Sequence, residues 1–271
     1  MMSPQKDQEL DQKQMLEMLR FQVEAGADEC IRDEPLTSFE AEQVAPAAVS
    51  LPEKPPASGT DPAASVADNP ALFSPQISPA FEAAETLDAL RSACAEFEGC
   101  DLKKTASNMV FADGNPEAKV MLIGEAPGAD EDRQGKPFVG VSGQLLDRML
   151  ASIGLDREQV YITNILLWRP PGNRTPTTEE IALFMPIIRR HIQLVAPQVL
   201  LTLGGSATKA LLGTSTGILK LRGKWHSFDD GAGGEIPLLP TLHPAYLLRT
   251  PGQKALSWHD LRLLHRHLAA S

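Results

Sequence analysis

The residues with the clearest chemical capacity stand in a loop that follows a short apolar segment, residues 119–123. Four carboxylates occur there within eight residues: Glu125, Asp130, Glu131 and Asp132. One or two of them could orient a water molecule for attack on a carbon that becomes positively charged. Gly124 and Gly128 in the same loop let the backbone approach a ligand closely. The alternative is that these acidic side chains are only solvated, as acidic loop residues commonly are.

An asparagine and a histidine follow two later apolar segments in the same way. Asn164 ends residues 160–164, and its amide offers one hydrogen-bond acceptor and two donors. His243 follows residues 236–242. A lone histidine is more often a packed or surface residue than a catalyst, but this one stands at a strand end. An open α/β sheet places its ligand at the carboxyl ends of its strands, so we expect these side chains to meet there.

The elements that would position these residues alternate between strands and helices. The apolar patterns predict strands over 119–123, 160–164, 198–203 and 236–242, and helices over 144–153, from Thr177 onward and over 258–268. Thr177 is a suitable helix cap, and the two glutamates that follow it place carboxylates in the first turn. Strands separated by helices favour a parallel sheet covered on both faces. The sequence therefore predicts an α/β fold, a three-layer α/β/α sandwich with a short, mostly parallel four-stranded central sheet.

The charge of the chain divides it into two unlike parts. Residues 1–85 contain 5 basic and 16 acidic residues, whereas residues 86–271 contain 20 basic and 19 acidic ones. The net charge is therefore −11 in the first part and +1 in the second, against −10 for the whole chain. The acidity of residues 1–85 does not argue against a nucleic-acid ligand for residues 86–271. A protein that coats DNA without sequence preference would, however, need a surplus of Lys and Arg.

Composition predicts three regions. Residues 1–41 form an acidic segment, in which apolar residues over 8–31 recur at helical spacing. Residues 42–85 are rich in Pro, Ala and Ser, and too poor in apolar surface to fold, which indicates a disordered linker. Residues 86–271 would be the folded domain. The front helix would dock on a protein partner, pack back on the domain, or have no role of its own.

Cysteine content and the start of the chain bear on location. Three cysteines without paired spacing, Cys30, Cys94 and Cys100, fit a reducing cytoplasm better than a disulfide framework. The first residues are polar, and no apolar run reaches the ~18 residues that span a bilayer. We expect a monomer in the cytoplasm, associated with the nucleoid and without a membrane partner.

Three longer motifs resemble family 4 of the uracil-DNA glycosylase superfamily. They are residues 124–140 (GEAPGADEDRQGKPFVG), 169–176 (RPPGNRTP) and 243–249 (HPAYLLR), within a resemblance that covers about 95–262. The resemblance implies the α/β/α fold of that superfamily. It also implies an enzyme that flips deoxyuridine out of single- or double-stranded DNA and hydrolyses its N-glycosidic bond. The products would be free uracil and an abasic site, as in base excision repair.

The resemblance also implies roles for particular residues. Phe138 would stack on the flipped base, Asn164 would read its N3–H and O4 edge, and His243 would stabilise charge on O2. The catalytic residues carried over in this way are Glu125, Glu131, Asn173 and His243. The substrate-binding residues are Ala126, Gly128, Phe138 and Asn164. The DNA-binding residues are Gly205, Ser206, Arg222, Leu247, Leu248 and Arg249, although Gly205 and Ser206 could instead form a plain strand-to-helix turn.

One part of the family pattern is broken. Family 4 members hold a four-iron cluster through four cysteines, and the resemblance aligns those positions with Phe97, Cys100, Trp168 and Phe184 of this chain. A single thiolate cannot hold a cluster that takes four. We therefore expect no metal and no organic cofactor, with aromatic packing in the volume of the cluster.

Two other classes of function stay open. The chain could be a non-catalytic uracil-binding, DNA-binding or polymerase-associated module that kept the base site and lost its activity. The presence of Glu125, Phe138, Asn164, Asn173 and His243 together argues against that interpretation. A nucleotide-binding hydrolase of similar layered fold is the other alternative, and a magnesium requirement would favour it.

Overall fold

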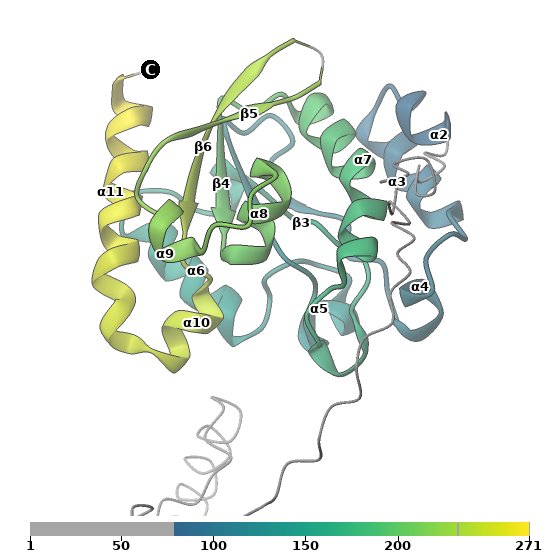
Figure 1. The fold of residues 1–271 in the computed structure, drawn as a ribbon, viewed down its shortest axis with the longest axis horizontal. Helices are drawn as coiled ribbons and strands as arrows, with labels where there is room; N and C mark the ends of the chain where they lie inside the picture. The colour runs from purple at the N-terminus through teal and green to yellow at the C-terminus, as the bar shows by residue number, and fades with distance from the viewer. Residues whose placement is uncertain (1–78, 232, 271) are drawn as a thin grey trace, which may run out of the picture. The chain divides into compact units, whose positions relative to one another are not determined.

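The computed structural model describes residues 79–231 and 233–270 (Figure 1). The predicted front helix and most of the predicted linker lie outside the described residues. The α-helices are α2 (Pro79–Glu82), α3 (Leu87–Glu96), α4 (Leu102–Thr105), α5 (Ala129–Gln134), α6 (Val141–Ala151), α7 (Thr178–Val195), α8 (Gly205–Leu212), α9 (Ile218–Leu221), α10 (Pro244–Arg249) and α11 (Lys254–Ala270). Short 3-10 helices are η1 (Arg157–Gln159), η2 (Pro171–Asn173) and η3 (Pro251–Gln253). Within the described ranges, no helix combines the length and the apolar character needed to cross a lipid bilayer.

The strands form one mixed sheet of six strands in the order β1-β3-β2-β4-β6-β5. They are β1 (Asp113–Gly114), β2 (Val120–Gly124), β3 (Val160–Asn164), β4 (Val199–Leu203), β5 (His226–Asp229) and β6 (Glu235–Thr241). The four predicted strands are the parallel ones, and β1 and β5 pair antiparallel at the two edges. The prediction of a four-stranded sheet was therefore wrong. The edge strands carry polar residues and glycine, so no apolar run marks them in the sequence.

Each face of the sheet packs against its own layer of helices. Met121 and Ile123 of β2 belong to one buried cluster with residues of α3, α7 and α8. Val120 and Leu122 belong to a second cluster with residues of α6 and α11. Neighbouring residues of a strand point to opposite faces, so a strand covered on both sides is apolar throughout. Figure 1 shows α11 and α7 on opposite sides of the strands, and the predicted three-layer sandwich is confirmed.

The sequence marks the start of α7 more clearly than the start of α6. Thr177 accepts a hydrogen bond from the Glu180 backbone N–H at 3.2 Å, and the Glu180 carboxylate accepts one from the Thr177 N–H at 2.8 Å. This capping box confirms Thr177 as the helix start. Helix α6 begins at Val141, three residues before the predicted start at Gln144. The prediction began too late because the first turn includes Gly143, and a glycine there interrupts the helical pattern of the sequence.

The folded unit also begins earlier than the predicted boundary at residue 86. Phe81 of α2 and Ala84 are buried, and the Phe81 ring meets the Phe97 ring edge-on with centroids 5.2 Å apart. Arg190 Nε donates a hydrogen bond to the Ala84 carbonyl at 2.9 Å. The assignment of residues 79–85 to a disordered linker was therefore wrong. A single buried aromatic anchors this segment despite its Pro- and Ala-rich composition.

Candidate active site

Four residues converge at the carboxyl ends of the parallel strands, and we call them the strand-end cluster: Gly124, Phe138, Asn164 and His243. Gly124 and Asn164 are partners in the register of β2 and β3. A side chain on Gly124 would collide with the Asn164 carboxamide oxygen and would stand 2.6 Å from the Phe138 ring. The Phe138 and His243 rings lie with centroids 5.6 Å apart. The structure thus brings together the three side chains predicted to hold and activate a base.

Asn164 is the unusual member of the cluster. The residue is 1% exposed, and its Nδ2 has no hydrogen-bond partner among the described residues. A buried donor without a partner costs about 1–3 kcal/mol. Such a group in a native fold needs an explanation, and a ligand that accepts the hydrogen bond provides one.

Phe138 holds its place through an unusual backbone. Its φ is 53°, in the left-handed region that residues other than glycine seldom adopt. Gly143 of α6 packs against the Phe138 backbone so closely that a side chain on Gly143 would overlap the Phe138 carbonyl. Phe138 as a whole is 4% exposed. Backbone strain of this kind persists where the surrounding structure over-determines it, often at functional sites.

His243 is held as a neutral imidazole. It caps α10, and its Nδ1 accepts a hydrogen bond from the Ala245 backbone N–H at 3.1 Å. A ring nitrogen that accepts carries no proton, so the proton of the neutral ring is on Nε2. Burial, assisted by the charge of Arg249, lowers the pKa of His243 from 6.5 to about 4. At neutral pH the residue therefore offers an uncharged Nε2–H donor.

Three of the four acidic residues of the predicted loop, Asp130, Glu131 and Asp132, lie on α5, and the Glu131 carboxylate holds the segment from Gly128 to Gly140 closed. Glu131 Oε1 accepts hydrogen bonds from the backbone N–H groups of Val139 at 2.9 Å and Gly140 at 3.0 Å. Oε2 accepts a third from Gly128 N–H at 3.2 Å, and a side chain on Gly128 would stand 2.7 Å from that oxygen. The carboxylate is thus engaged with the backbone at both ends of the loop that carries Phe138. This geometry fits a supporting role better than the predicted direct one.

Glu125 and Ala126 follow β2 directly and are half-buried. The Glu125 carbonyl accepts a hydrogen bond from Leu166 N–H at 3.1 Å, which fixes the backbone next to the end of β3. Among the described residues, no hydrogen bond or ion pair engages the Glu125 carboxylate. Of the two acids predicted to be catalytic, Glu125 is therefore the one whose oxygens stay available to a water molecule.

Asn173 is connected to the acidic loop through an arginine. Arg169 Nε donates to Asn173 Oδ1 at 2.7 Å, and Arg169 Nη1 lies 3.9 Å from Asp132 Oδ2. Asp132 is buried, and its Oδ1 accepts from the backbone N–H of Ser107 at 2.8 Å. Asn173 itself is exposed, with a left-handed φ of 55°. This chain of contacts presents the Asn173 amide at the surface of the loop.

The turn before α8 lies against the strand-end cluster. Gly204 has a φ of 94°, and a side chain there would stand 3.0 Å from His243 Cβ. Gly205 and Ser206 follow, both half-buried, at the first turn of α8. Their backbone N–H groups stand where an anion such as a DNA phosphate could be held. Ser206 does not cap α8, because the N-cap is Gly204 and no side chain bonds to the helix start there. The use of this turn as a DNA contact stays a prediction.

Arg222 does not face outward as predicted for a DNA contact. Its side chain is 11% exposed, its Nε donates to Asp260 Oδ2 at 3.0 Å and its Nη2 donates to the Leu256 carbonyl at 2.6 Å. Asp260 Oδ2 also accepts a hydrogen bond at 2.7 Å from Oγ1 of Thr241, which stands two residues before His243 in the sequence. The prediction for Arg222 was therefore wrong. Its charge is needed inside, beside a buried carboxylate on α11.

Helix α10 divides its apolar residues between core and surface. Leu247 is 1% exposed, which contradicts its prediction as part of a wedge into DNA. Leu248 is half-buried and Arg249 is exposed, so these two can still reach a duplex. The sequence Tyr-Leu-Leu-Arg does not distinguish the two leucines, because their difference lies only in the phase of the helix.

A second region contains the positions where the resemblance aligns cluster ligands, and we call Phe97, Cys100, Trp168 and Phe184 the aromatic region. Trp168 and Phe184 are 3% and 0% exposed, with ring centroids 5.8 Å apart. Phe97 instead meets Phe81. Burial raises the pKa of the Cys100 thiol, and that of the neighbouring Cys94 rises to about 12. In the part of the chain that the structure describes, no three His, Cys, Asp or Glu side chains gather as a metal site would require.

Comparison with known proteins gives a consistent result. A family model described as the uracil DNA glycosylase superfamily matches residues 111–262. A type-4 uracil-DNA glycosylase of Saccharolobus solfataricus is 38% identical over 191 residues, which are 69% of this chain and 88% of that protein. One from Sulfurisphaera tokodaii is 36% identical over 190 residues, covering 68% and 86%. One from Archaeoglobus fulgidus is 40% identical over 171 residues, covering 62% and 85%.

Proposed function

Because the chain belongs to the uracil DNA glycosylase superfamily and is a uracil-DNA glycosylase of base excision repair, we propose that the strand-end cluster is its base-binding site. The enzyme hydrolyses the bond between uracil and deoxyribose, which leaves free uracil and an abasic site in DNA. The observation that supports this assignment is the buried, unpaired Nδ2 donor of Asn164, whose carboxamide oxygen lies next to Gly124 as the Phe138 ring does.

Asn164 and Phe138 would together select the base. A flipped uracil stacked on Phe138 presents N3–H to the Asn164 carboxamide oxygen and O4 to the free Nδ2 donor. Cytosine carries an amino group where uracil carries O4, so its donor would face the Asn164 donor. Stacking tolerates any base, and the amide adds the discrimination. The unpaired Nδ2 would be satisfied only when uracil is bound.

His243 would stabilise the leaving group. As the C1′–N1 bond breaks, its electron pair stays on uracil, and negative charge develops at O2. The Nε2–H of the neutral His243 would donate a hydrogen bond to that oxygen. A donor that is already in place costs no reorganisation at the moment of reaction, and removal of one such donor typically costs about 10²–10³ in rate.

Glu125 would orient the water. The deoxyribose left behind is oxocarbenium-like, and a water oxygen attacks its C1′ while the water proton passes to the carboxylate or to solvent. Glu125 follows β2 beside the cluster, and Glu131 would support this step indirectly by holding the loop closed. Asn173 would contact the sugar or the backbone of the bound DNA from the outer side of the loop.

We further propose that the enzyme works without an iron–sulfur cluster. A cluster of that kind takes four thiolates. The aromatic region offers one cysteine, whose thiol is buried with a raised pKa, and three aromatic side chains. The residues of the aromatic region therefore do not fit an iron–sulfur cluster. The packing of Trp168 on Phe184 and of Phe97 on Phe81 would supply the structural support instead.

The test is uracil excision from labelled single- and double-stranded oligonucleotides in EDTA, followed by alkaline cleavage of the abasic site. We expect strand cleavage by the wild-type chain and a loss of about 10²-fold or more in His243→Ala. His243→Asn serves as a matched variant, because its shorter amide can still accept from the Ala245 N–H and preserve the cap. The iron content of the purified protein is measured in parallel.

The outcomes separate the alternatives. Wild-type activity with no stoichiometric iron supports a cluster-free glycosylase. Iron in stoichiometric amount contradicts the cluster-free proposal but not the site. Uracil-specific DNA binding without cleavage would favour the non-catalytic module, and a strict need for magnesium would favour a different hydrolase.

A further inference from the structure

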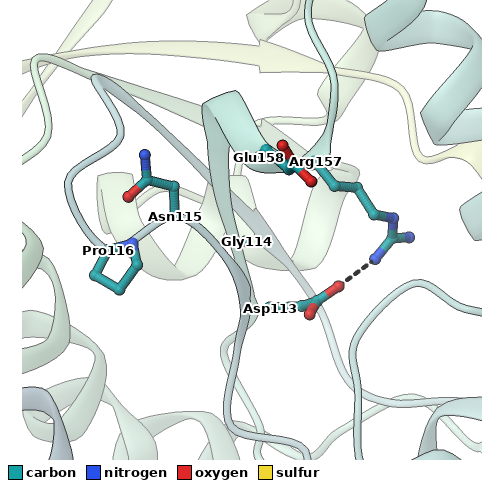
Figure 2. Close-up of a pocket in the computed structure, with 6 residues that line it drawn as sticks. All are labelled: Asp113, Gly114, Asn115, Pro116, Arg157 and Glu158. Carbon is teal, nitrogen blue, oxygen red and sulfur yellow. Dashed lines mark hydrogen bonds and ion pairs between the residues drawn. The ribbon is translucent and has the colours of Figure 1, made fainter.

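Arg157 connects two acidic side chains near the edge of the sheet to the loop that carries Phe138. It stands at the start of η1, on the wall of an open hollow of about 470 Å³ (Figure 2). None of the predicted site residues lines that hollow. The Arg157 guanidinium is held by two carboxylates: its Nε donates to Asp147 Oδ1 at 2.8 Å and its Nη1 to Asp113 Oδ2 at 2.8 Å. Charge-assisted bonds to two different elements, α6 and β1, fix the plane of the guanidinium.

The same guanidinium also binds two consecutive backbone carbonyls. Nη1 donates to the Pro137 carbonyl at 3.2 Å, and Nη2 donates to the Phe138 carbonyl. Arginine can do this because its planar fork presents several donors in a fixed geometry, which a lysine ammonium does not. Arg157 therefore fixes the two peptide groups that flank the Phe138 α-carbon.

Those carbonyls belong to the strained turn described above. Phe138 has a φ of 53°, and Gly143 packs against its carbonyl from the side of α6. The left-handed backbone would relax toward the extended region if one of the two supports were lost. A rotation of the Phe138 backbone would carry its ring away from Gly124 and from His243, which lies 5.6 Å away between centroids.

We propose that Arg157 is a positioning residue for the reaction, which acts by holding the Phe138 ring in the orientation that stacks on the flipped base. This inference rests on the proposed role of Phe138. Arg157 itself does not touch the base. Asp113 and Asp147 are its supports, and Lys136, which lies 3.3 Å from Asp113 Oδ1, completes the charge balance on the solvent side.

The proposal predicts that Arg157 has its effect through Phe138 and through no other residue of the site. Arg157→Met should therefore lower kcat/KM for uracil excision by about 100-fold, the scale expected when a reacting group is misplaced by about 1 Å. In a Phe138→Ala background, the same substitution should lower kcat/KM by less than about threefold, because no ring remains to be positioned.

The experiment is this double-mutant cycle on a single-stranded uracil oligonucleotide, with kcat and KM determined separately. Arg157→Lys is carried through the same cycle, so that the proposal stays testable if Arg157→Met does not fold. Lysine keeps the charge but cannot bridge two carboxylates and two carbonyls, and we expect it to restore activity only in part. If Arg157→Met lowers kcat/KM by the same factor with and without the Phe138 ring, the proposal is overturned.

A matched control separates positioning from stability. Arg190 also donates to a backbone carbonyl, that of Ala84 at 2.9 Å, and to Gln193 Oε1 at 3.1 Å, but it lies on α7. Arg190→Met should lower the melting temperature while leaving kcat/KM of the folded enzyme unchanged. If Arg190→Met lowers kcat/KM as Arg157→Met does, the effect is one of stability and the proposal fails.

The cycle is also measured on the Kd for the uracil oligonucleotide, relative to one with thymine. A wild-type chain without excision activity would contradict the proposed function, yet the coupling between Arg157 and Phe138 in binding would still be measurable. Active wild type with no coupling in either quantity would contradict the Arg157 proposal alone.

Discussion

The strand-end cluster and the aromatic region lie in the same domain but differ in how completely their groups are satisfied. In the cluster, a buried amide donor lacks a partner among the described residues, Phe138 has a left-handed backbone, and a side chain on Gly124 would collide with Asn164 and Phe138. In the aromatic region, Trp168 and Phe184 are packed rings within the core. Unmet hydrogen bonds and strain are typical of a site that awaits a ligand, whereas close packing is typical of structural support.

The comparison predicts opposite effects of substitution in the two regions, and the largest is expected at Asn164. Asn164→Leu keeps the side-chain volume but removes both hydrogen-bonding groups. We expect excision to fall on the order of 10⁴-fold, since polar groups built to read a substrate discriminate on that scale. The free energy of unfolding should stay the same or rise, because the unpaired buried donor is gone.

The measurement is single-turnover excision together with urea unfolding monitored by circular dichroism. Asn108→Leu, at an exposed asparagine that bonds the backbone of α5 through Nδ2 at 2.7 Å, serves as a control with a satisfied amide. A large loss of stability in Asn164→Leu would show that its amide supports the fold rather than the chemistry.

Phe184→Ala should give the reverse result. The ring is fully buried against Trp168, and removal of such a side chain typically costs about 3–5 kcal/mol of unfolding free energy. The rate of excision per folded molecule should be nearly unchanged at a temperature well below the transition. Leu219→Ala, at a leucine that is 62% exposed, is the matched control and should affect neither quantity. A loss of activity in folded Phe184→Ala would contradict the assignment of structural support to the aromatic region and of the chemistry to the strand-end cluster.

The smallest expected effect per step of the measurement, that is per pH unit, is a dependence of stability on pH that involves one histidine from the site and one from the core. Burial lowers the pKa of His243 to about 4 and that of His191 to about 3, both from 6.5. Between pH 6.5 and about 4, the unfolded chain binds protons that the folded chain does not. Stability therefore falls as the pH falls through this window, by up to about 1.4 kcal/mol per pH unit for each histidine.

Urea unfolding at several pH values measures this slope. His191 lies between the Phe111 ring, stacked at 4.5 Å, and the Tyr161 hydroxyl, 2.8 Å from its Nε2. His191→Gln should remove about one proton from the slope and leave the excision rate unaffected at neutral pH, whereas His243→Asn should reduce both. An unchanged slope in both variants would mean that other groups control the acid sensitivity.

Sequence patterns predicted much of the framework on which these regions depend. The parallel strands were found because a strand covered on both faces is a continuous apolar run, and Thr177 was found because a cap has a local chemical signature. The edge strands β1 and β5 were missed, since half-exposed polar strands leave no such run. Phe81 was missed because one aromatic in a Pro- and Ala-rich segment does not alter its composition.

At the site, the residue types and their positions after strands predicted that Asn164 and His243 would lie at the same edge of the sheet, whereas the role of Phe138 came only from the family resemblance. The strand ends of a parallel sheet meet at one edge, so order along the chain implies proximity in space. What each neighbour does was decided by tertiary contacts. Glu131 closes a loop, Arg222 pairs with a buried aspartate and Leu247 faces the core, although each stands in a motif that suggested a different role.

The sequence by itself determined the layered fold, the edge of the sheet that carries the site and the chemical groups available there, because these follow from local periodicity and residue type. Only the tertiary structure decided which of those groups remain free. A hydrogen bond from Gly140 to Glu131, or from Arg157 to the Phe138 carbonyl, joins residues 9 and 19 positions apart, and no local pattern encodes it. Contacts between distant segments of this kind decide whether a polar side chain is hydrogen-bonded within the fold or remains free to bind a substrate.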